Sequence, residues 1–200
     1  MGGEKRMDNK CTQVTLYTIQ TDKVLEQLKQ NGYHTAKMKF IKEKYGEVAS
    51  TFVDAYKWYV FNAEKIVPRP EEAESAVWSY RDPLYIEKHS GCQVLQITAP
   101  IKDAVFFRMS DWNKRLNLRY IGKNSEEENT YDKKLLQYGV DYEGNVFLTS
   151  FYPQLKNELV KSWQNLFQYD SLVKKQGDLL FPDMQAGFWR LEWDWVQRIL

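Results

Sequence analysis

Two stretches that alternate apolar and polar residues constrain the fold of this chain more than any other feature. Val14 and Leu16 in residues 14–19 (VTLYTI), and Leu95, Ile97 and Ala99 in residues 93–99 (QVLQITA), are apolar residues two positions apart. This period of two is typical of β-strands. Between them, residues 36–62 carry apolar side chains at steps of three and four, the period of a helix that packs on a core. The sequence therefore predicts a sheet and a long helix, which Gly46 either kinks or divides in two.

Shorter patterns predict the remaining elements. Thr21 or Asp22 caps a helix over residues 23–30, and Ser110 or Asp111 caps another over residues 112–117. Residues 122–132 are acidic and polar and are expected to form a loop. Further strands are expected at residues 76–80, 104–107, 146–151, 185–192 and 196–200, and a helix is expected to carry Leu155, Leu159, Trp163 and Phe167 on one face.

The order of these elements predicts the fold class. Strands lie at both ends of the chain with helices between them, without a strict alternation of strand and helix. This order is typical of an α+β fold, in which helices pack on one mixed or antiparallel sheet. The length of 200 residues suits one domain. We therefore expect a single α+β domain over residues 13–200, with its first strand near the centre of the sheet, after a disordered tail at residues 1–12.

Composition narrows the classes of function. Aromatic residues make up 15% of the chain, which excludes disorder over most of its length. The formal net charge of +1 argues against a general nucleic-acid coat, which needs a surplus of basic residues. Lysines within residues 37–44 offer weak support for a nucleic-acid partner, because glutamates dilute them.

Several common features are absent from the sequence. It has no apolar run of about 18 residues, so we expect no membrane span. The start of the chain lacks the apolar centre of a signal peptide, so we expect a cytoplasmic protein in which Cys11 and Cys92 stay free thiols. His34 and His89 have no nearby cysteine or histidine, and we expect no metal site. The phosphate-binding loop, the nucleophile elbow and the dinucleotide-binding glycine motif are also missing.

Six short blocks, in order along the chain, resemble a bacterial family catalogued as domain of unknown function 3841. They are residues 16–20 (LYTIQ), 55–58 (AYKW), 77–80 (VWSY), 110–117 (SDWNKRLN), 162–167 (SWQNLF) and 185–191 (QAGFWRL). The family has a histidine where this chain has Asn113 or Lys114, and a threonine and a glutamate where Gly187 and Arg190 stand. If those polar groups carry chemistry in relatives, this chain would be altered or inactive.

The opening of the chain also resembles ADP-ribosyltransferase-like domains, through the strand at residues 16–19, the helix at residues 24–30 and Gly32. That resemblance implies a site for the cofactor NAD. In it, Tyr17 or Thr18 would hold the nicotinamide ribose, and Trp78 or Tyr80 would stack on nicotinamide. Gln185 or Glu192 would be the catalytic residue, holding a ribose hydroxyl and stabilising the oxocarbenium-like transition state.

Each of these residues also has a plain structural interpretation. Tyr17, Trp78 and Tyr80 can be packing aromatics, and Gln185 can satisfy a local hydrogen bond. Arg81 can bind a phosphate through two parallel hydrogen bonds, or it can be an ordinary surface arginine. Glu192 stands among tryptophans, where burial raises the pKa of a carboxyl, or at the surface.

The sequence leaves three functions open. The first is a non-catalytic module whose aromatic-lined cleft binds a nucleotide-like small molecule or a partner protein, in a phage or bacterial defence setting. The second is an NAD-dependent ADP-ribosyltransferase-like enzyme, active or degenerate. The third is a structural protein that dimerises through exposed aromatic residues.

Overall fold

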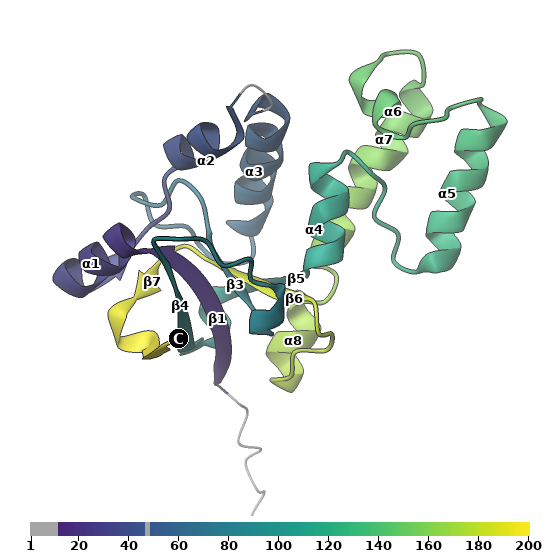
Figure 1. The fold of residues 1–200 in the computed structure, drawn as a ribbon. Coiled ribbons are helices and arrows are strands. Elements are labelled where there is room, and N and C mark those ends of the chain that lie inside the picture. Colours follow the sequence, from purple (N-terminus) through teal and green to yellow (C-terminus); the bar gives the residue numbers. More distant parts are fainter. Residues whose placement is uncertain (1–11, 47–48) are drawn as a thin grey trace, which may run out of the picture.

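A six-stranded antiparallel sheet forms the centre of the protein (Figure 1). The computed structural model describes residues 12–46 and 49–200, so the predicted tail at residues 1–12 lies outside the described residues apart from Thr12. The strand order is β5-β6-β3-β1-β4-β8, which confirms the central position of the first strand. The strands are β1 (Gln13–Thr21), β3 (Val77–Tyr80), β4 (Cys92–Pro100), β5 (Ala104–Arg108), β6 (Met184–Phe188) and β8 (Val196–Ile199).

The two alternating stretches of the sequence are the longest strand pair. β1 pairs with β4 along its whole length, from Gln13 opposite Pro100 to Thr21 opposite Cys92. Val14 and Leu16 are buried on one face of the sheet, while Thr15 on the other face is exposed. The apolar side chains of Val14, Leu16, Leu95 and Ile97 therefore enter the core, as the period of two predicts.

The helices of the first half follow the sequence signals closely. α1 (Asp22–Asn31) is capped by Thr21, whose Oγ1 accepts a hydrogen bond from the Val24 amide at 3.2 Å. α1 ends at Gly32, whose φ of +80° suits glycine. The predicted long helix is two helices, α2 (Met38–Tyr45) and α3 (Ala49–Ala63), so of the two alternatives at Gly46 the division is confirmed.

Two predicted elements in the second half of the chain have the wrong secondary structure. α5 (Ser125–Gln137) replaces most of the predicted acidic loop, because Asn124 caps it and three glutamates stabilise its first turn. The predicted strand over residues 146–151 begins inside α6 (Gly144–Leu148), since so short an apolar run does not separate strand from helix.

Other helices differ from the prediction in their bounds. α4 (Met109–Leu116) begins three residues early, so Ser110 and Asp111 lie in its first turn and do not cap it. The predicted helical stripe spans α7 (Pro153–Ser162) and the 3₁₀ segment η4 (Trp163–Phe167). The sequence patterns missed α8 (Asp170–Gln176) and β2 (Tyr33–His34). The predicted strand over residues 185–192 is two strands, β6 and β7 (Leu191–Glu192), and β7 pairs with β2 in a small second sheet. Short 3₁₀ turns are η2 (Pro83–Tyr85), η3 (Ile101–Asp103) and η5 (Trp193–Trp195).

The sheet lies between two hydrophobic cores, which confirms a single α+β domain. One core holds Leu16, Ile97 and Phe106 from the sheet with side chains from α1 and α8. The other holds Phe107 from the sheet with side chains from α3, α4 and η4, and it continues into α5, α6 and α7. In Figure 1 these last three helices extend to one side of the sheet.

Candidate functional site

Three of the predicted site residues lie in one row across the sheet. Tyr17 of β1 stands opposite Tyr80 of β3, and Tyr80 stands opposite Gln185 of β6. On its other side, Tyr17 stands opposite Gln96 of β4. Directly opposed residues of antiparallel strands point to the same face, with Cβ atoms about 5 Å apart. The fold therefore gathers Tyr17, Tyr80 and Gln185 side by side, and we call these residues with Gln96 the tyrosine–glutamine row.

Exposure is lowest at the β6 end of this row. Gln96, Tyr17 and Tyr80 are half-buried, whereas Gln185 is 5% exposed. The Oε1 atom of Gln185 is buried and has no hydrogen-bond partner among the described residues. An unpaired buried amide oxygen costs about 1–3 kcal/mol, because it gives up its hydrogen bonds to water. The inner end of the row therefore holds a hydrogen-bond acceptor that the described residues leave unsatisfied.

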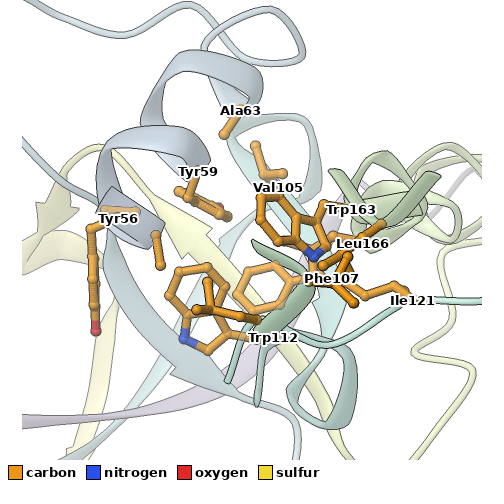
Figure 2. Close-up of a cluster of buried hydrophobic side chains, with 14 of the residues drawn as sticks. Tyr56, Tyr59, Ala63, Val105, Phe107, Trp112, Ile121, Trp163 and Leu166 are labelled. Atoms are coloured by element: carbon orange, nitrogen blue, oxygen red, sulfur yellow. The ribbon is translucent and has the colours of Figure 1, made fainter. Parts of the chain in front are cut away.

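Trp78 lies on the same face, two residues before Tyr80 in β3, and belongs to a packed aromatic cluster. Its ring centroid lies 4.8 Å from that of Tyr59 and 5.4 Å from that of Trp112. Its Nε1 donates a hydrogen bond to the Tyr56 hydroxyl at 3.3 Å. Figure 2 shows Tyr56, Tyr59 and Trp112 gathered with Phe107 in this core. The rings around Trp78 fill space with one another and form one wall beside the row.

Thr18 and Arg81 bind the sheet together and do not join the row. Thr18 is fully buried on the opposite face, where its Oγ1 donates to the Trp78 carbonyl at 2.8 Å and accepts from Gln20 at 2.7 Å. The Arg81 amide donates to the Met184 carbonyl at 2.9 Å, and its guanidinium donates to the Leu179 carbonyl. Arg81 thus holds the segment that leads into β6.

Glu192 lies in the small sheet, apart from the six-stranded one. It stands opposite Tyr33, and its carboxylate pairs with Arg190 at 3.1 Å. Of the two predicted catalytic residues, only Gln185 is in the row. A groove of about 310 Å³ lies elsewhere, between α2, α3 and the segment before β3, and no predicted site residue lines it.

The two departures from the family pattern in the last block have structural explanations. A Cβ atom at Gly187 would lie 2.2 Å from the Tyr59 hydroxyl oxygen, so glycine gives this tyrosine the room it occupies. Arg190 pairs with Glu192 and Glu72, at 3.1 Å and 3.8 Å, and its guanidinium lies 4.0 Å from the centre of the Tyr33 ring. Both residues therefore serve packing in this chain.

Two carboxyl groups near this face have shifted pKa values. Burial raises the pKa of Asp111, and Lys114 at 3.4 Å offsets only part of that effect. Burial also acts to raise the pKa of Asp183, but hydrogen bonds from Ser110 and Arg108 outweigh it and hold that pKa below its usual value. The sequence analysis missed Gln96, although it is a polar residue in phase with the outward positions of its strand.

Fold and site together define the class: an α+β protein whose central antiparallel sheet presents a row of two tyrosines flanked by glutamines. The chain belongs to the family described as Domain of unknown function (DUF3841), which it matches over residues 15–197. This match confirms the resemblance carried by the six blocks. No curated protein and no solved structure matches the chain.

Two features are absent from residues 12–46 and 49–200. Within those residues, no helix is both long enough and apolar enough to span a bilayer. Nor does that part of the chain hold a group of three or more histidine, cysteine, aspartate or glutamate side chains placed to bind a metal ion.

Proposed function

We propose that this protein binds a nucleotide-like small molecule on the tyrosine–glutamine row. The observation that carries the proposal is the register that sets Tyr17 beside Tyr80 and Tyr80 beside Gln185. Half-buried aromatic rings offer faces on which a planar base can stack, and stacking accepts any base. An amide oxygen accepts a hydrogen bond from an N–H group of such a base.

The burial of Gln185 determines which residues of the row a ligand contacts first. The Gln185 oxygen is covered, so a ligand meets the rings of Tyr17 and Tyr80 first. No described residue donates to this oxygen, so an N–H group of the ligand that reached it would meet an acceptor without a partner. This contact removes the cost of an unpaired buried acceptor, so it favours binding in addition to the stacking.

Binding is better supported than catalysis. An NAD-dependent ADP-ribosyltransferase-like activity is the second proposal, favoured by Gln185 on a late strand close to Tyr17 of the first strand. Of its two predicted catalytic residues, however, the carboxylate Glu192 belongs to the small sheet and pairs with Arg190. A partner protein, a second copy of the chain and a role in defence against phage stay alternatives from the sequence.

Two further expectations stay proposals. We place the protein in the cytoplasm, where Cys92 would remain the free thiol that it is in the structure. A nucleic-acid partner is less favoured, because Lys37 already contacts the Glu72 carbonyl at 2.6 Å and Glu74 at 3.4 Å.

Calorimetric titration with adenosine, AMP, ADP and NAD tests the proposal. Replacing Tyr17 with alanine should weaken binding by roughly 5- to 150-fold, since stacking on one ring contributes about 1–3 kcal/mol. Tyr138→Ala is the matched control, because Tyr138 is an exposed tyrosine at the end of α5. Nicotinamide release from NAD would support the transferase. Failure of all four compounds to bind at millimolar concentration, or equal affinities for Tyr17→Ala and the native chain, would overturn the proposal.

A further inference from the structure

The row extends beyond Gln96 to the edge strand of the sheet. Arg198 of β8 stands opposite Gln96 of β4, and Gln96 stands opposite Tyr17 of β1. Opposed residues share a face, so Arg198, Gln96 and Tyr17 follow one another across three neighbouring strands. The register irregularity between β4 and β8 comes after Gln96 and leaves this pairing in place.

Arg198 has no ion pair or side-chain hydrogen bond among the described residues, and its side chain is exposed. The positions around it on the same face of β1 and β4 are uncharged. They are Thr15, Tyr17, Ile19, Val94, Gln96 and Thr98. No acidic side chain on these two strands competes for the guanidinium, so its charge is available to a ligand.

We infer that Arg198 binds the phosphate of the ligand, so that the protein selects nucleotides over nucleosides. This inference rests on the proposed function. Strands lie about 4.8 Å apart, so the backbones that carry Arg198 and Tyr17 are about 10 Å apart. A nucleotide bridges such a span with its base on the tyrosines, its sugar over Gln96 and its phosphate at the guanidinium.

The chemistry of each position fits its part of the ligand. An arginine fork forms two parallel hydrogen bonds with a phosphate, and these are stronger than neutral hydrogen bonds. The side-chain amide of Gln96 donates and accepts, as a sugar hydroxyl also does. The row therefore changes in character from a cation at the open edge, through an amide, to rings and a buried acceptor.

Paired calorimetric titrations with adenosine and AMP at low salt test this assignment. For the native chain, AMP should bind roughly five- to tenfold more tightly than adenosine, because the guanidinium reaches only the phosphate. Arg198→Gln should remove that preference and leave the affinity for adenosine unchanged. Lys133→Gln, which removes the same charge from an exposed site on α5, should keep the preference.

The outcomes separate the inference from the proposed function. Equal affinities of the native chain for adenosine and AMP, or a preference that survives Arg198→Gln, would overturn the phosphate assignment while adenosine still binds. If Lys133→Gln loses the preference for AMP as fully as Arg198→Gln does, the preference arises from net charge, and the role of Arg198 is overturned. If neither compound binds, the proposed function fails and this inference fails with it.

Discussion

Adding one methyl group at Gly187 should destabilise the protein. A Cβ atom there would lie 2.2 Å from the Tyr59 hydroxyl oxygen and 3.1 Å from the Ala76 Cβ. The Tyr59 ring cannot move away easily, because it is fully buried and contacts Trp78 and Phe107 with centroids 4.8 Å and 5.5 Å apart. Overpacking of this kind costs about 1–3 kcal/mol. Loss of glycine flexibility in the unfolded chain returns about 0.4–1 kcal/mol, so we expect Gly187→Ala to cost about 1–2 kcal/mol.

The companion change removes the oxygen that the methyl group would meet. The Tyr59 hydroxyl is buried without a hydrogen-bond partner among the described residues, so Tyr59→Phe should cost nothing or stabilise by about 1 kcal/mol. In the double variant, the ring carbon that carried the hydroxyl lies 3.1 Å from the new methyl group, a distance that a small shift relieves. Gly187→Ala should therefore cost at least about 1 kcal/mol less in the Tyr59→Phe background.

Urea unfolding of the four proteins, followed by tryptophan fluorescence, measures this coupling. The slope with urea should stay constant, so that the midpoint reports the free energy of unfolding. Tyr138→Phe is the control, because an exposed and distant tyrosine should combine additively with Gly187→Ala. Additivity of Gly187→Ala and Tyr59→Phe within about 0.5 kcal/mol would refute the steric explanation of Gly187.

Two further changes test buried charges. Burial lowers the pKa of Arg115 from 12.5 to about 10, which corresponds to a destabilisation of about 3 kcal/mol for the charged side chain. The guanidinium carbon lies 3.8 Å from the centroid of the Trp163 ring, and this cation–π contact stabilises by about 2 kcal/mol. Arg115→Met should therefore raise the free energy of unfolding by about 1 kcal/mol, and a fall of that size in urea unfolding would contradict this balance. Burial raises the pKa of Asp111. The folded chain therefore binds the carboxyl proton of Asp111 more tightly than the unfolded chain does. The contribution of Asp111 to stability falls as pH rises above the usual aspartate pKa of about 3.9. Asp111→Asn should therefore gain stability relative to the native chain as pH rises above about 3.9, and a difference that stays constant with pH would argue against this reasoning.

Local patterns predicted much of the fold because the forces behind them are local. The alternation in β1 and β4 and the cap of α1 each depend on a few adjacent residues. The sequence predicted both strands, and for the cap it offered Thr21 or Asp22, of which the structure uses Thr21. The prediction of a loop at α5 was wrong because it rested on the acidic, polar composition of residues 122–132. The glutamates after Asn124 are typical of a helix start, and their polarity alone suggested a loop.

The candidate site was predictable only as a set of residues. The sequence alone indicates that Tyr17, Tyr80 and Gln185 belong to strands. It offers Thr18, Arg81 and Glu192 as equally good site candidates. Strand pairing decides which of these side chains meet, because slipping the register by one residue sends every side chain to the opposite face. That register depends on how both faces of the sheet are covered, by α3 and α4 on one side and by α1 and α8 on the other. These contacts join residues far apart in the chain, so tertiary packing, and not any local pattern, places two tyrosines and a buried amide in one row.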